Sequence, residues 1–180
     1  MYELELKAKA DLDASRALLK DISAEYKGAG NVIDTYYDTP SFFLEGRDEA
    51  LRIRSARDGT SICFKGRDTG GVEKNRREFE SDIDLEAGHA ILAALGFVRV
   101  GVVAKHRETY TFDNMTICLD SVDGIGDFVE IEMIQHFDSK QAKERLFEFA
   151  DALGLTNFVK DPYIRMLQTK SAGRRSSVAI

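Results

Sequence analysis

The sequence predicts an α+β fold in which many antiparallel strands, accompanied by few helices, form a barrel or a sandwich. Three observations support this fold class. Most of the chain divides into β-rich segments that turn residues separate. Few segments place apolar residues at helical spacing. The β-rich segments alternate between apolar and charged residues, so the two faces of each strand meet different surroundings.

The first half of the chain contains five expected strands and one helix. Residues 2–7, Tyr-Glu-Leu-Glu-Leu-Lys, alternate strictly and form the first strand. Asp58-Gly59 is a common two-residue hairpin turn, so the segments that flank it pair with each other. The remaining strands of this half span residues 32–38, 50–57, 60–66 and 74–82. Asp11 caps the helix, whose apolar residues are Leu12, Leu18, Leu19 and Ile22.

The second half adds three strands and three helices. A helix over residues 84–95 begins near Asp84 and ends at Gly96. An amphipathic helix runs from Ser139 to Leu153, and a short last helix covers residues 162–169. The strands span residues 97–112, 115–122 and 127–134. Residues 171–180 are polar and lack periodicity, so we expect a flexible tail. With neither a repeat nor a linker, residues 1–170 form a single domain.

Composition excludes several classes of protein. The 25 basic and 31 acidic residues give a net charge of −6, which argues against a nucleic-acid-binding protein. Neither an apolar run of transmembrane length nor a signal peptide is visible, so no membrane partner is expected. Cys63 and Cys118 lack the spacing of a zinc site or a disulfide framework. We therefore expect a cytoplasmic protein.

The charged faces of the strands determine the functional prediction. Glu3, Glu5 and Lys7 share the face of the first strand that is opposite Leu4 and Leu6. A solvated edge strand would explain this strand alone. Six further strands repeat the pattern, however, and their dense mixture of acids and bases favours the lumen of a closed barrel whose apolar faces pack outward against helices. The charges of these six strands are Arg52, Arg54, Lys65, Arg76, Glu78, Glu80, Lys105, Arg107, Asp120, Glu130 and Glu132.

A lumen that contains both signs of charge suits one kind of ligand. The lysines and arginines can bind a polyanion, because the arginine fork matches phosphate. The carboxylates repel phosphate unless a hard divalent cation lies between them, and Mg²⁺ is commonly held by carboxylates and substrate phosphates. A triphosphate satisfies both sets of groups. The sequence contains neither a Walker loop nor Gly-x-Gly-x-x-Gly, so phosphate binding at a helix N-terminus is not expected.

These stretches carry a resemblance to a known family. The opening Glu-Leu-Glu-Leu-Lys resembles the Glu-x-Glu-x-Lys signature of the CYTH superfamily, the triphosphate tunnel metalloenzymes. The chain is most similar to their class IV (CyaB-type) adenylate cyclases. Further matching stretches, in the order of the family, are DTYYDTP, EALRIR, CFKG, KHRETY, DSVDGIGDFVEIE and PYIRML. The resemblance implies a CYTH domain with a closed eight-stranded antiparallel barrel, a triphosphate substrate and a requirement for Mg²⁺ or Mn²⁺.

The resemblance also implies roles for individual residues. The implied metal ligands are Glu3, Glu5, Asp120, Glu130 and Glu132. The implied phosphate contacts are Lys7, Arg52, Arg54, Lys65, Lys105 and Arg107. The catalytic residues are accordingly expected among Glu5, Lys7, Asp120 and Glu130. Tyr163 matches a tyrosine near the end of the cyclase-like sequences.

Several questions stay open at this level. The leading reaction is conversion of ATP to cyclic AMP and pyrophosphate. The alternatives are hydrolysis of thiamine triphosphate, inorganic triphosphate or nucleoside triphosphates, and non-catalytic binding of a nucleotide or polyphosphate. The family makes a homodimer plausible. Cys63 and Cys118 are interpreted as space-filling residues on the inward face. Lys74, Arg76 and Arg77 fit an exposed basic edge as well as a substrate contact.

Overall fold

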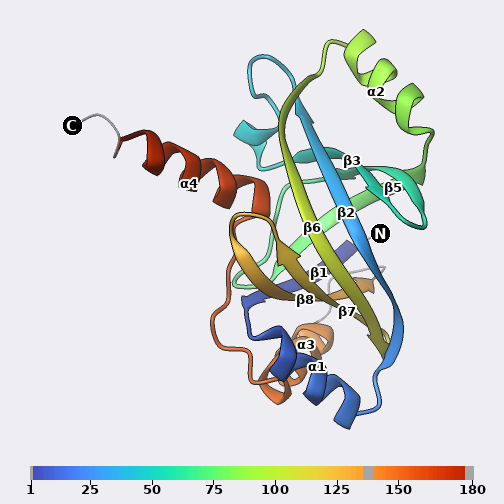
Figure 1. Cartoon of the computed structure of the whole chain (residues 1–180), viewed down its shortest axis with the longest axis vertical. Coiled ribbons are helices and arrows are strands. Elements are labelled where there is room, and N and C mark those ends of the chain that lie inside the picture. Colours follow the sequence, from blue (N-terminus) through green and yellow to red (C-terminus); the bar gives the residue numbers. More distant parts are fainter. Residues whose placement is uncertain (1, 136–139, 177–180) are drawn as a thin grey trace.

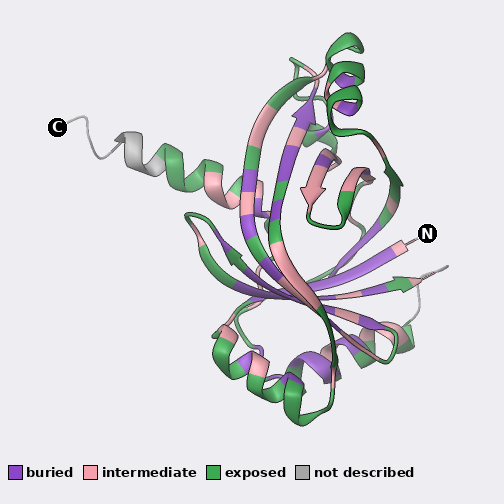
Figure 2. Cartoon of the chain, turned by 45° about the vertical axis from the view of Figure 1, so that its right-hand side comes forward, coloured by how far each residue is buried: buried purple, intermediate pink, exposed green. Residues whose placement is uncertain are grey.

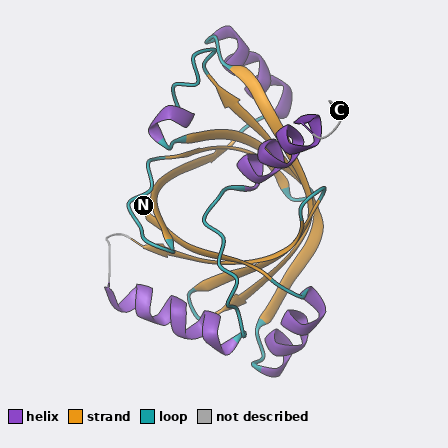
Figure 3. Cartoon of the chain, turned by 90° about the vertical axis from the view of Figure 1, so that its left-hand side faces the viewer, coloured by secondary structure: helices purple, strands orange, loops and turns teal. Residues whose placement is uncertain are grey.

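Eight strands close into one antiparallel barrel in the computed structural model, which describes residues 2–135 and 140–176. The order around the barrel is β1-β5-β4-β3-β2-β6-β7-β8, and Figure 3 shows the closed ring of strands with the helices outside it. The predicted eight-stranded barrel is confirmed. The strands are β1 (Tyr2–Lys9), β2 (Glu25–Asp38), β3 (Ala50–Ala56), β4 (Gly59–Lys65), β5 (Lys74–Asp82), β6 (Val98–Phe112), β7 (Met115–Val122) and β8 (Gly126–Gln135).

Four helices and one short 3₁₀ turn connect or flank the strands. In Figure 1, α1 and α3 lie at one end of the barrel, α2 lies at the other, and α4 projects from its side. No helix in the described part of the chain is long and apolar enough to span a membrane. The elements are α1 (Leu12–Asp21), η1 (Glu45–Arg47), α2 (Leu85–Ala94), α3 (Lys140–Ala152) and α4 (Tyr163–Ser176).

The largest apolar core lies outside the barrel wall. The outward residues of β1, β7 and β8 pack against α1 and α3, whose inner faces include Leu19, Leu146 and Phe149. Figure 2 shows these strands and the inner faces of the two helices as buried. A smaller cluster joins α2 to β2 and β3 through Leu92, Tyr37 and Ile53. The helices therefore cover the apolar faces, as the alternation predicts, and the opposite faces are left for the lumen.

One end of the lumen is apolar, which corrects the expectation of an almost wholly charged interior. Val103, Val122 and Phe128 are buried and alternate in phase with the charged residues of β6, β7 and β8. They cluster with Tyr163, the first residue of α4. The Phe128 and Tyr163 rings are tilted, with centroids 5.0 Å apart. Helix α4 therefore contributes a side chain to the barrel interior.

Local signals placed most elements correctly, and tertiary pairing explains the exceptions. The side chain of Asp11 caps α1 by accepting from the amides of Asp13 and Ala14, and Asp84 caps α2 in a similar way. β2 begins at Glu25 rather than residue 32, because its glycine-rich first half pairs with the long β6. A strand partner thus overrides the weak propensity of this segment.

Two further boundaries were predicted wrongly. The β3–β4 turn uses Arg57 and Asp58, because Gly59 already pairs with Ala56. Gly59, which follows the turn, has a positive φ of 149°. Only glycine adopts this conformation readily. Helix α4 continues to Ser176, so residues 171–176 are helical rather than irregular. The end of this helix lacks apolar periodicity because it projects from the barrel (Figure 1). The expected helix start at Ser139 lies outside the described residues.

Candidate functional site in the barrel lumen

Strand register brings the predicted site residues of β1 and β8 side by side. Glu5 pairs with Glu132, and Lys7 pairs with Glu130, so all four side chains point into the lumen. On the other side of β1, Glu5 pairs with Lys74 of β5. Lys7 Nζ lies 3.3 Å from Glu130 and 3.4 Å from Glu5. Apart from Glu132, which is partly exposed, these side chains are buried.

Asp120 is the centre of a buried cluster of cations. Its side chain is fully inaccessible and accepts bonds from Arg107 at 2.6 and 2.5 Å and from Lys105 at 2.8 Å. The hydroxyl of Tyr163 donates to the same carboxylate at 3.1 Å. Arg107 also contacts Glu130. Because its oxygens are occupied by these donors, Asp120 holds two predicted phosphate-binding cations in fixed positions.

Asp34 of β2 pairs with the arginines of β3 as Asp120 pairs with Arg107 and Lys105. It accepts a bidentate interaction from Arg54, at 2.7 and 2.9 Å, and lies 3.9 Å from Arg52. Burial alone would raise the pKa of Asp34, but the two guanidinium groups lower it below its usual value. Asp34 is therefore an ionised partner for both arginines in the described structure.

Three carboxylates form a cluster that cations only partly neutralise. Oxygens of Glu3, Glu5 and Glu132 lie within 4.8 Å of one another. Burial raises the pKa of Glu3 to about 8 against the charge of Lys65, and the carboxylates of Glu132 and Glu5 add to the increase. Burial also raises the pKa of Glu132. Lys65 contacts Glu3 and Lys74 contacts Glu5, but the spacing of the three sets of oxygens suits a divalent cation of the Mg²⁺ or Mn²⁺ type, which would favour the ionised carboxylates.

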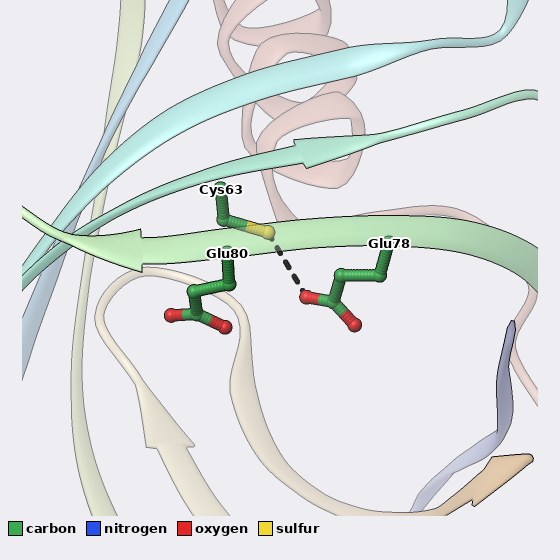
Figure 4. A group of neighbouring side chains, drawn as sticks. All are labelled: Cys63, Glu78 and Glu80. Atoms are coloured by element: carbon green, nitrogen blue, oxygen red, sulfur yellow. Dashed lines mark hydrogen bonds between the residues drawn. The ribbon is translucent and has the colours of Figure 1, made fainter. Parts of the chain in front are cut away.

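A second set of potential ligands lies on β4 and β5, as Figure 4 shows. The thiol of Cys63 donates to Glu78 at 2.9 Å, and Glu78 lies 3.6 Å from Lys65. Glu80 is exposed and accepts from Ser61 at 2.5 Å. Burial raises the pKa of Cys63 to about 12, so the thiol is neutral. Because its thiol is neutral and Glu80 is exposed, this group is a weaker metal candidate than the more buried glutamate cluster.

The lumen reaches the surface through cavities at two places. The first, about 110 Å³, lies beside α4, and both Glu5 and Lys7 line it. The second is wider, about 570 Å³, and lies between β2 and the β3–β4 turn, with Arg107 and Glu132 at its inner end. We call them the α4 mouth and the turn mouth. The glutamate cluster lies between them, because Glu5 faces one and Glu132 the other.

Comparison with known proteins identifies the family of this barrel. The family model described as "CYTH domain" matches residues 1–162. The chain belongs to the CYTH family. "Putative adenylate cyclase MJ0240" of Methanocaldococcus jannaschii is 31% identical over 168 residues, 92% of this chain and 95% of the relative. "Adenylate cyclase CyaB" of Aeromonas hydrophila is 27% identical over 161 residues, 87% of this chain and 82% of the relative.

Solved structures of similar shape include PH1819 from Pyrococcus horikoshii. It has a TM-score of 0.83 at 32% identity, and the match covers 93% of this CYTH chain and 99% of that one. The Hippeastrum protein HpAC1, described as a putative adenylyl cyclase with a dominant triphosphatase activity, has a TM-score of 0.72 at 19% identity. That match covers 93% of this chain and 96% of the other, and it shows a shared fold.

The CYTH barrel brings the residues predicted from the sequence into one lumen but divides them into groups. Glu3, Glu5 and Glu132 form the acidic cluster, whereas Asp120 and Glu130 lie among cations. No role was predicted for Asp34 from the sequence, which left open whether Lys74 and Arg76 form an exposed edge or contact the substrate. Lys74 and Arg76 are buried rather than an exposed edge, and Lys74 Nζ lies 3.2 Å from Glu5. Alternation placed Arg76 on the inward face with Glu78 and Glu80, and Lys74 shares the same phase.

Proposed function

We propose that this CYTH protein is a divalent-metal-dependent enzyme that acts on a triphosphate compound in the lumen, and that its reaction is that of an adenylate cyclase. The observation that carries the proposal is the pairing of buried lysines and arginines with the cluster of Glu3, Glu5 and Glu132. A polyanion neutralises the first set, and a cation neutralises the second. The names of the relatives at 31% and 27% identity support the cyclase assignment.

Some residues of the lumen bind the phosphates, and others hold these binding residues in position. Lys7, Arg52, Arg54, Lys65, Lys105 and Arg107 bind the phosphate oxygens. Asp120 and Asp34 hold four of these cations in place before the substrate arrives, so little reorganisation is needed during the reaction. Glu3, Glu5 and Glu132 would hold Mg²⁺ or Mn²⁺, which supplies charge neutralisation between carboxylate and phosphate when bound.

In the cyclase reaction, the ribose 3′-oxygen forms a bond to the α-phosphorus. The bond from that phosphorus to the bridging oxygen breaks, pyrophosphate leaves, and the hydroxyl proton is released. Negative charge grows on the leaving pyrophosphate, and the lysines and arginines of the lumen lie where they can stabilise it. Lys7, which touches both Glu5 and Glu130, links the acidic cluster to the phosphate-binding cations.

A triphosphatase is the second candidate. The same cations would stabilise a terminal phosphoryl group under attack by water, and the turn mouth is open enough to admit water. The activity in the description of HpAC1 shows that this fold accommodates such a reaction in another protein. Thiamine triphosphate, inorganic triphosphate and nucleoside triphosphates are the candidate substrates. A non-catalytic binder would use the same lumen without turnover.

A product assay separates these functions. ATP, thiamine triphosphate and tripolyphosphate are each incubated with the protein and Mg²⁺ or Mn²⁺, and the products are resolved by chromatography. Cyclic AMP with pyrophosphate supports the cyclase, and orthophosphate release supports the triphosphatase. Tight binding of a triphosphate without any product supports the binder. If none of the three compounds binds or reacts, the proposed function is wrong.

A further inference from the structure

The two mouths of the lumen differ in chemistry, and the difference suggests how the substrate is oriented. We propose that the α4 mouth binds the planar organic group of the substrate, so that its phosphate chain points toward the turn mouth. The inference rests on the proposed function, because it assumes a triphosphate in the lumen. It adds a binding site for an aromatic base and a direction for the chain, neither of which the charge pattern of the strands specifies.

The α4 mouth offers apolar and aromatic walls. Tyr36 projects into it from β2, Val100 borders it from β6, and Pro162, Tyr163 and Ile164 close it from the start of α4. Gly101 allows this close approach, since a Cβ at that position would lie 2.3 Å from Ile164 Cδ1. A planar ring gains by leaving water for such walls, and aromatic pairs add to the gain. The amide of Gln168 lies at the rim, where it can contact ring nitrogens.

Two arginines at the same mouth have unused hydrogen-bond donors. The Nε atoms of Arg52 and Arg76 are buried and have no hydrogen-bond partner among the described residues. Both side chains line the α4 mouth, together with Lys74. A buried guanidinium N–H without a partner is costly, so this arrangement points to an anionic ligand group that completes it. The phosphate directly attached to the organic group would occupy this position.

The described residues of the turn mouth form no aromatic wall. Lys27 is exposed at this mouth, and Arg54 and Arg107 line its inner end, while no aromatic side chain occurs among the described residues that line it. Although this cavity is the larger of the two, it offers a ring nothing to stack on. Both mouths offer cations to phosphate, so the aromatic walls of the α4 mouth are what distinguish the two. Arg52 and Arg54 lie about 6.6 Å apart along one face of β3, at the usual rise per residue, so successive phosphates can pass from one to the other.

The first test compares a nucleotide with a ligand that has no organic group. Binding of α,β-methylene-ATP, whose α–β bridge a cyclase cannot break, and of tripolyphosphate is measured by calorimetry in the presence of Mg²⁺. Tyr36→Ala removes a wall of the α4 mouth and should weaken binding of the ATP analogue about tenfold or more, as expected for lost base stacking. Tripolyphosphate binding should change less than twofold. Val32→Ala, a matched truncation of a buried residue at the turn mouth, should affect the two ligands equally.

A second test does not depend on the stability of the Tyr36 variant. The chain has no tryptophan, so a single introduced indole reports on its own surroundings. Gln168 and Asp58 are exposed residues at the α4 mouth and the turn mouth, respectively. The fluorescence of Gln168→Trp should be quenched by the ATP analogue and not by tripolyphosphate. The fluorescence of Asp58→Trp should respond equally to both ligands.

The outcomes separate this inference from the function on which it rests. If neither ligand binds the unaltered protein, the proposed function is wrong, and the orientation is wrong with it. If both ligands bind but Tyr36→Ala weakens them equally, or if the ATP analogue quenches Asp58→Trp alone, the organic group does not occupy the α4 mouth. In that case the triphosphate site stands and the proposed direction of the chain is refuted.

Discussion

Replacement of Asp120 by asparagine tests whether this carboxylate holds the phosphate-binding cations. The change removes the negative charge that Arg107 and Lys105 share, in a fully buried position. Loss of one partner from a buried ion pair costs about 3–5 kcal/mol of stability. For a domain of this size, 1 kcal/mol corresponds to about 2–4 °C, so the melting temperature should fall by about 6–20 °C.

Added polyanion should reduce this loss. In chelator, where divalent metal is absent, tripolyphosphate supplies negative charge to the cations that Asp120→Asn leaves uncompensated. A ligand that binds the folded protein and not the unfolded chain stabilises the fold, by about 2.7 kcal/mol when the ligand concentration is a hundred times Kd. Because the variant should bind more tightly than the unaltered protein, its melting temperature should rise more. The assay is thermal unfolding followed by circular dichroism, with and without tripolyphosphate.

A matched control is Asp113→Asn, which removes an exposed carboxylate paired with Arg145 at 3.1 Å. Its effect should remain within about 0.5 kcal/mol under both conditions. If tripolyphosphate leaves the gap between Asp120→Asn and the unaltered protein unchanged, Asp120 does not position phosphate-binding cations. The same conclusion would follow if the two substitutions destabilised the protein equally.

Three further changes test other parts of the structure. Glu5→Gln should abolish turnover with an unchanged circular dichroism spectrum, because the outer apolar packing is untouched; retained turnover would show that Glu5 is not needed for metal binding. Arg107→Ala should weaken tripolyphosphate binding by about 1.5–3 kcal/mol, measured by calorimetry in chelator and in Mg²⁺. An unchanged affinity would remove Arg107 from the phosphate site. Gly101→Ala should destabilise the protein by about 1 kcal/mol, because its Cβ meets Ile164 Cδ1, and Ile164→Val should restore the melting temperature. No restoration would place the strain elsewhere.

The fold was largely predictable because strand alternation and helix caps are local signals. The alternation of β1 identified Glu3, Glu5 and Lys7 as inward residues, and the structure buries all three. The caps Asp11 and Asp84 marked the starts of their helices. The inverted packing, with apolar residues outward, followed from the density of charge on the opposite faces. These inferences need only the period of a strand or the geometry of a helix end.

The partners of each charge were not predictable, because alternation gives the face of a strand and not its neighbours across the lumen. The sequence treated Asp120 as equivalent to Glu5, yet Asp120 lies among cations and Glu5 among carboxylates. Asp34 was missed because residues 32–38 were not among the strands whose charged faces were compared. Tyr163 enters the lumen from a helix, so no reasoning about strand phase could assign its contacts.

The position of Tyr163 has a practical consequence for work with shortened proteins. The family match ends at residue 162, whereas α4 begins at the next residue. A protein cut at the family boundary would keep every strand and lose the ring over which the Lys7 and Lys105 ammonium groups lie, at 4.4 and 5.0 Å from its centroid. It would also expose Val103 and Phe128 to solvent. Poor activity of such a fragment would therefore reflect a missing wall of the lumen rather than the wrong substrate.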